Sequence, residues 1–206
     1  MQLNRPLATI TPTLDGDVLA VLAQHEATFT VAQLHRVLDH YSEEGVRKVL
    51  LRLTRQGIVH STRFGSTYAY QLNREHLAAD SIIQLARLAH RLLRRIEEYL
   101  GNWELQPRYA AIFGSAARGT MTEESDIDIL LVRDDSTPID DWDTQVSALA
   151  FDVSRWTGND ARPLEYTVSE LLAARDEPVI FDIMKDGLTV AGRRAWLNQQ
   201  LREAGS

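Results

Sequence analysis

The run Ile127–Val132 most constrains the fold, because it is apolar at all but one of its positions. A strand with one solvated face alternates apolar and polar residues, whereas a nearly unbroken apolar strand is buried on both faces. Burial of both faces requires a sheet covered by helices on each side. We therefore expect a small α/β domain over residues 102–206. Its further strands are expected at Tyr109–Phe113 and Pro163–Val168. Its helices are expected at Asp141–Trp156, Glu170–Arg175, Pro178–Lys185 and Arg194–Arg202.

The N-terminal part of the chain has a different pattern, typical of three short helices followed by a hairpin. Helical spacing of apolar residues begins near Asp15, and Thr30 with Gln33 forms a capping box that opens a second helix. Ser42 has the cap chemistry for a third helix that ends near Gly57. Two β-rich runs follow, with the turn-forming Phe64-Gly65-Ser66 between them.

These pieces resemble a winged helix-turn-helix domain over residues 12–73, so we expect such a domain within residues 1–73. The resemblance implies a third helix in the major groove of double-stranded DNA and a wing that contacts the backbone or the minor groove. The basic residues implied as DNA contacts are Arg47, Lys48, Arg52, Arg55 and Arg63. The alternative is a winged helix that serves dimerisation or another protein contact. The class of the whole chain is therefore expected to be α+β.

Residues 74–101 keep a helical apolar stripe, and we expect one continuous connector helix from Arg74 to Tyr99. This helix either packs against the two domains of its own chain or pairs with a second copy in a homodimer. The sequence leaves both alternatives open.

Composition excludes several classes of protein. The chain has no cysteine, so disulfides, thiolate metal sites and cysteine nucleophiles are excluded. It shows no secretory signal and no apolar stretch of membrane-spanning length, which predicts a cytoplasmic protein without membrane contact. The net charge of −7 is concentrated in the C-terminal half, where acidic side chains suit the binding of cations.

The apolar strand carries an unusual pair of acids at its start. Asp126 and Asp128 are two residues apart, so both carboxylates leave the same face of the strand. They repel each other and lose hydration there, and a divalent cation such as Mg²⁺ relieves both costs. Upstream, Gly114 and Ser115 follow the strand Tyr109–Phe113, where a residue without Cβ lets a phosphate approach the backbone.

Gly114-Ser115, followed after ten residues by Asp126-x-Asp128, resembles the signature of the DNA polymerase β-like nucleotidyltransferase superfamily. The resemblance covers residues 103–192 and is closest to the minimal bacterial branch. It implies that Asp126 and Asp128 hold Mg²⁺ and take part in catalysis, and that Gly114 and Ser115 bind phosphate of a nucleoside triphosphate. Arg118 either contacts a phosphate or pairs with an acid as a structural clamp.

The family also has a third carboxylate on a neighbouring strand that helps to bind metal and to activate the acceptor. Glu165 is the only acid in the expected third strand, so the resemblance places it in the catalytic and metal-binding set. The family more often has aspartate at this position. The alternative is that Glu165 is a surface residue of the strand.

Two main functions follow from these expectations. The first is a Mg²⁺-dependent enzyme that moves AMP from ATP to a hydroxyl, with a protein acceptor as in toxin–antitoxin pairs of the minimal branch. The second is a DNA-binding transcriptional regulator whose nucleotidyltransferase domain senses nucleotide without catalysis. An inactive scaffold that holds a partner is a third alternative.

Overall fold

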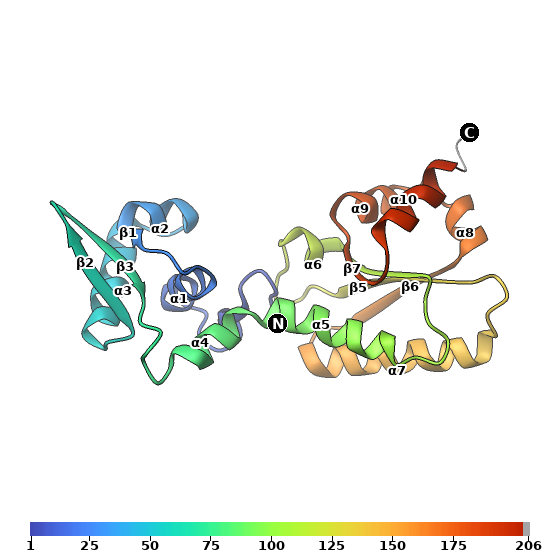
Figure 1. Cartoon of the computed structure of the whole chain (residues 1–206), viewed down its shortest axis with the longest axis horizontal. Helices are drawn as coiled ribbons and strands as arrows, with labels where there is room; N and C mark the ends of the chain where they lie inside the picture. The colour runs from blue at the N-terminus through green and yellow to red at the C-terminus, as the bar shows by residue number, and fades with distance from the viewer. Residues whose placement is uncertain (204–206) are drawn as a thin grey trace. The chain divides into compact units, whose positions relative to one another are not determined.

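The computed structural model describes residues 1–203 and separates into two compact units (Figure 1). The first unit spans Arg5–Ala89. The second consists of Met1–Asn4 together with the chain from His90 onward. Each unit has a hydrophobic core of its own.

The N-terminal unit contains helices around a small antiparallel sheet whose strand order is β1-β3-β2. Its elements are η1 (Pro6–Thr9), α1 (Leu14–Gln24), β1 (Phe29–Thr30), α2 (Val31–Val37), α3 (Glu43–Arg55), β2 (Val59–Phe64), β3 (Thr67–Leu72) and α4 (Ala79–Ala86). The expected order of three helices and a hairpin is confirmed, and the short strand β1, which pairs with β3, is an addition to it.

The helix boundaries of this unit follow from local side-chain chemistry. Thr30 and Gln33 form the expected capping box of α2, and the Ser42 hydroxyl accepts from the Gly45 N–H at the start of α3. The buried stripe of α3 packs into the core of the unit. Its members are Val46, Val49, Leu50 and Leu53. The buried carboxylate of Asp17 accepts hydrogen bonds from Arg5 and Tyr41, which ties α1 to its surroundings.

The expected continuous helix from Arg74 to Tyr99 is wrong. The chain instead forms α4 (Ala79–Ala86) and α5 (Leu88–Gly101), with the helical backbone interrupted at Arg87. Ile82 of α4 belongs to the core of the N-terminal unit, whereas Ile96 of α5 lies in the second unit. The two halves of the apolar stripe therefore serve separate cores, and the helix breaks between them.

The second unit is built on a mixed sheet with strand order β6-β5-β4-β7. The strands are β4 (Tyr109–Phe113), β5 (Ile127–Arg133), β6 (Ala161–Thr167) and β7 (Leu188–Gly192). β5 runs antiparallel to β4 and parallel to β6, and β7 is antiparallel to β4 on its other side. β7 was not expected from the sequence, which left residues 187–190 as a connection between helices.

The central strand β5 is buried on both faces, as its apolar composition predicts. From Ile129 to Val132 every residue is fully buried. Figure 1 shows α5 and α7 on one face of the sheet and α8, α9 and α10 on the other. The short α6 follows β4. The bounds of these helices are α6 (Gly114–Arg118), α7 (Ile139–Thr157), α8 (Val168–Ala173), α9 (Pro178–Asp186) and α10 (Arg194–Glu203).

The alternation of side chains along β5 assigns its residues to the two faces. Leu130 and Val132 pack with Leu171 of α8 and Ile183 of α9 in one apolar cluster. Asp128 has the same parity along the strand and therefore leaves the sheet on this face. None of the helices within residues 1–203 combines the length and the apolar character that a membrane span requires.

Candidate functional site

The chain turns sharply where β4 ends and α6 begins. Gly114 has a φ of +67°, in the left-handed region that favours glycine. A Cβ at this position would collide with the carboxylate of Asp128, which pairs in register with Phe113 on the adjacent strand. The glycine is therefore required twice, for the backbone angle and for the close approach of the carboxylate. Gly114 and Asp128, distant in sequence, lie directly against each other.

Asp128 is half-buried at the start of β5, and Asp126 precedes the strand by one residue. Desolvation raises the pKa of the Asp128 carboxyl most, and the negative charge of Asp126 raises it further. The guanidinium groups of Arg162 and Arg118 lower this pKa in part. The electrostatic conflict expected from the sequence, two nearby carboxylates of which one is poorly hydrated, is therefore present in the structure.

Hydrogen bonds to the preceding loop hold Asp126 in place. The Ser125 hydroxyl accepts from the Thr122 N–H at 2.9 Å, and the Ser125 carbonyl accepts from the Asn159 side-chain amide at 2.7 Å. Asn159 is itself only 4% exposed, and its N–H donates to the Thr157 hydroxyl. Asn159 is a positioning residue that the sequence did not reveal, because its side chain binds Ser125, which is distant in the sequence.

Arg162 is the second residue that sequence reasoning missed. It pairs in register with Asp128 across the parallel strands β5 and β6, so both side chains leave the same face. Its Nη1 lies 2.9 Å from Oδ2 of Asp126, and its Nε lies 3.4 Å from Oδ2 of Asp160. The signal in the sequence was an arginine directly before the expected third strand, Pro163–Val168. That end of the strand lies beside the start of β5.

In the structure Glu165 lies apart from the acidic pair Asp126 and Asp128. It pairs in register with Leu131, whose side chain points to the opposite face of the sheet from Asp128. There its Oε2 accepts a hydrogen bond of 2.6 Å from the indole N–H of Trp142 on α7. Glu165 therefore anchors a helix on the far face.

The remaining residues expected at the site lie on α6. Ser115 is half-buried in the first turn of this helix, next to Gly114. Arg118 is exposed, and its Nη1 lies 3.5 Å from Oδ2 of Asp182 on α9. Of the two expected roles of Arg118, the arrangement favours a pairing with an acid. Its guanidinium still acts on Asp128 through the electrostatic field.

The arrangement fits one divalent cation. Asp126 and Asp128 supply oxygen ligands on one face, and Mg²⁺ is usually bound by one or two carboxylates together with water and phosphate oxygens. Within residues 1–203, no three histidine, aspartate or glutamate side chains come together in a way that could hold a metal. The two aspartates therefore suit a cation, whereas a third acidic ligand is not present among the described residues.

The basic residues expected to contact DNA divide into two groups. Arg47 lies 3.5 Å and 3.4 Å from the carboxylates of Glu43 and Glu44, and Arg52 forms an ion pair with Asp15 of α1. All five residues are exposed, and the other three form no ion pair among the described residues. Lys48 and Arg55 lie on α3, and Arg63 lies on β2, where its Nε donates to the Gly65 carbonyl.

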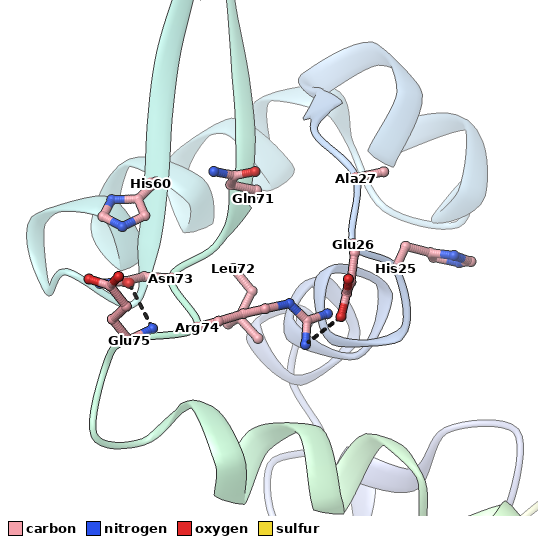
Figure 2. Close-up of a pocket in the computed structure, with 9 residues that line it drawn as sticks. All are labelled: His25, Glu26, Ala27, His60, Gln71, Leu72, Asn73, Arg74 and Glu75. Carbon is pink, nitrogen blue, oxygen red and sulfur yellow. Dashed lines mark hydrogen bonds and ion pairs between the residues drawn. The ribbon is translucent and has the colours of Figure 1, made fainter.

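A cavity of about 400 Å³ lies in the N-terminal unit (Figure 2). Its lining includes His60 of β2, and Arg74 lies 3.5 Å from Glu26 across it. The Glu75 N–H donates to the Asn73 side chain at 3.1 Å. The charges of Arg74 and Glu26 are therefore already matched, and we assign no chemistry to this cavity.

Comparison with known proteins gives the following matches. Residues 93–192 match the family model described as nucleotidyltransferase domain. No curated protein matches the chain. Two of the solved structures that match are a toxin–antitoxin complex with AMP-PNP and a mutant of the toxin–antitoxin pair MntA-HpeT. They have 16% and 15% sequence identity, a TM-score of 0.41 each, and cover 54% of this chain and 82% of their own.

Replacement of Asp128 by asparagine is expected to stabilise the metal-free protein at neutral pH. The pKa of the Asp128 carboxyl is higher in the folded state than in the unfolded state. The stability that the protonated carboxyl contributes is therefore fully present below the unfolded-state pKa and is lost as pH rises through the folded-state pKa. At neutral pH the ionised carboxylate is a cost that asparagine removes. Thermal unfolding should show a higher Tm for Asp128→Asn than for wild type at pH 7, with the difference shrinking toward pH 4. The exposed Asp143→Asn on α7 serves as the control. A lower Tm for Asp128→Asn at pH 7 would contradict the electrostatic argument.

Replacement of Glu165 by alanine is expected to affect stability and to spare ligand binding. The fully buried Trp142 loses the acceptor of its indole N–H, which should lower the free energy of unfolding by about 1–2 kcal/mol. Urea denaturation measures this change, and Glu165→Gln, which keeps an acceptor oxygen, should recover most of it. Calorimetric titration with Mg²⁺-AMP-PNP should give the same Kd for both variants as for wild type. A loss of nucleotide affinity in Glu165→Gln would return Glu165 to the site.

Proposed function

We propose that this protein transfers AMP from Mg²⁺-ATP to a hydroxyl group. Its residues 93–192 match the nucleotidyltransferase domain model, which supports this activity. The proposal rests above all on the acid pair Asp126 and Asp128 at the start of β5, of which Asp128 lies directly against the turn at Gly114. Glycine at this position lets the Asp128 carboxylate lie against the turn, and the backbone N–H groups at the start of α6 can donate to a phosphate chain. The acids would then face the metal that accompanies the phosphates.

In this reaction the acceptor oxygen forms a bond to the α-phosphorus of ATP. The bond between the α-phosphorus and the oxygen bridging it to the β-phosphorus breaks, pyrophosphate leaves, and the hydroxyl proton passes to solvent or base. A bound divalent cation supplies charge neutralisation at the phosphates. Asp126 and Asp128 hold that cation, Gly114 and Ser115 line the phosphates, and Arg118 adds positive charge nearby. We assign no role in the reaction to Glu165.

The acceptor that we propose is a protein side chain. Asp126 is 28% exposed and Arg162 is 62% exposed, so the site is open to solvent along the edge strand β6. An open site of this kind admits a side chain presented on the surface of another protein. A toxin–antitoxin pair, as in the minimal branch that the sequence resembles, is a setting that supplies such a partner.

Transfer of label from α-³²P-ATP tests the proposal. In the presence of Mg²⁺, wild-type protein is expected to label a macromolecule in a lysate of its host. Asp126→Asn and Asp128→Asn should each reduce labelling at least about a hundredfold, because the metal loses one of its two carboxylate ligands. With γ-labelled ATP the acceptor should stay unlabelled, since the γ-phosphate leaves in pyrophosphate.

Asp143→Asn serves as the matched control for loss of a carboxylate, and it should label like wild type. Competition by unlabelled GTP, CTP and UTP identifies the preferred base. Unchanged labelling in both Asp126→Asn and Asp128→Asn would contradict the assignment of the site.

The second function that we propose is binding of double-stranded DNA by residues 1–73, which we interpret as a winged helix-turn-helix domain. The exposed face of α3 favours it. Lys48 and Arg55 lie on this face on either side of Leu51, which is 45% exposed. The hairpin carries Arg63 beside the exposed Phe64. Exposed lysine and arginine side chains on a helix face and on a hairpin can contact DNA phosphates, so this surface suits a duplex.

The double variant Lys48→Gln with Arg55→Gln is expected to weaken binding to the DNA upstream of the protein's own gene. Loss of two phosphate contacts should make the slope of log K against log salt concentration less negative by roughly two units. Fluorescence anisotropy at several salt concentrations measures both effects. Arg94→Gln, an exposed arginine of α5 in the second unit, is the control and should bind like wild type. Equal affinity and equal salt dependence of the double variant and wild type would leave DNA binding without support.

The ion pairs decide which basic residues are suitable for substitution in this experiment. Arg52 is engaged with Asp15, so Arg52→Gln changes the link between α3 and α1 as well as the charge of the surface. Lys48 and Arg55 have no such engagement among the described residues and are the cleaner probes. Addition of Mg²⁺-ATP to the same anisotropy experiment tests whether nucleotide binding changes DNA affinity, as a sensor would require.

A further inference from the structure

An arginine lies next to Asp128 on the neighbouring strand. β5 and β6 are parallel, and the residue of β6 in register with Asp128 is Arg162. Residues in register on adjacent strands project from the same face, so this is the place where an acid of β6 could have joined Asp126 and Asp128. The only acid of β6, Glu165, is on the other face and bound to Trp142.

We propose that Arg162 replaces a third acidic ligand and supplies the positive charge that a second metal ion would otherwise bring. The site then holds a single divalent cation, and the Arg162 guanidinium neutralises Asp126 from the edge of the sheet. This inference rests on the function proposed above, because it concerns the same pair of acids.

The geometry of the pair supports a direct competition for Asp126. Arg162 Nη1 lies 2.9 Å from Oδ2 of Asp126, which makes a close ion pair. A cation that takes Oδ2 must displace this donor or share the oxygen with it. Asp128 has no ion pair of this length among the described residues, so it is the carboxylate that remains open to the cation. The two acids are therefore unequal, with one held by Arg162 and one available.

The charge balance of the site changes as a consequence. Asp126, Asp128 and Arg162 together carry a net charge of about −1, whereas the same three positions would carry about −3 with an acid in place of Arg162. A second divalent ion gains less from so small a charge. The freed guanidinium nitrogen atoms can instead donate to a phosphate oxygen, as arginine does readily. Arg162 is thus a positioning and charge-setting residue for the nucleotide.

The chain offers a matched control in Arg155 on α7. Its side chain is 65% exposed and pairs with Asp152 at 2.8 Å, whereas Arg162 is 62% exposed and pairs with Asp126 at 2.9 Å. These two ion pairs are alike in length and exposure and differ in their place in the fold, and Arg162 has the longer contact to Asp160 in addition. Exposed pairs contribute little to stability, so glutamine at either position should leave the protein folded.

Binding of Mn²⁺, followed by electron paramagnetic resonance, tests the proposal on the full chain. Wild type is expected to bind one ion, with or without AMP-PNP. Arg162→Gln should bind one ion about fivefold more tightly, because the cation no longer competes with Arg162 for Asp126. A change of about fivefold corresponds to an ion pair at the strong end of the range for exposed pairs. Arg162→Asp should bind two ions with a spin-coupled spectrum when AMP-PNP is present. Arg155→Gln should match wild type.

The outcomes separate the inference from the function on which it rests. Two coupled ions in wild type, a Kd within twofold of wild type for Arg162→Gln, or one ion in Arg162→Asp would each overturn the role of Arg162. The effect of Arg162→Gln should also vanish in an Asp126→Asn background, since it acts through that carboxylate. If folded wild type and all variants bind no Mn²⁺, the proposed function fails together with the inference.

Discussion

The register between β5 and its two neighbours is the constraint on which the candidate site depends. Antiparallel pairing with β4 brings Asp128 opposite Phe113 and places its carboxylate against Gly114. Parallel pairing with β6 brings Arg162 alongside. Because side chains alternate between faces, a shift of one residue in either pairing would move the acids and their neighbours to opposite sides of the sheet. The fully buried apolar residues of β5 oppose such a shift, since it would expose them or bury the charges.

This register also divides the sheet into a face for chemistry and a face for stability. The face of Asp128 carries the acids, Arg162 and the turn at Gly114, and farther along the same strands it packs on α8, α9 and α10. The opposite face packs on α5 and α7, where Glu165 satisfies the buried indole of Trp142. The acids remain at the end of the strand, where they are partly hydrated and where a cation can reach them. Repulsion between them is moderated by Arg162 and Arg118.

The sequence predicted most of the elements, because their signals are local. Thr30 and Ser42 marked the starts of α2 and α3 through cap chemistry, and the apolar run marked β5. The pair Asp126 and Asp128 was recognisable from spacing alone. The sequence is less informative about non-local choices. Glu165 alternates with apolar neighbours, but alternation along one strand does not reveal which face the next strand will align with it. Likewise, an apolar stripe through residues 74–99 does not show that its two halves belong to different cores.

The sequence by itself determined that two carboxylates leave one face of a buried strand, downstream of a glycine that lets another group approach its backbone. Spacing and residue chemistry suffice for these statements, because they concern neighbours along the chain. Only the tertiary structure decided what lies beside those carboxylates: Arg162 and not Glu165, with Arg118 directed to Asp182. It also decided that β7 completes the sheet and that Arg52 is held by Asp15. The physical reason is that strand pairing and ion pairing join residues far apart in sequence, and their geometry exists only after the cores have packed.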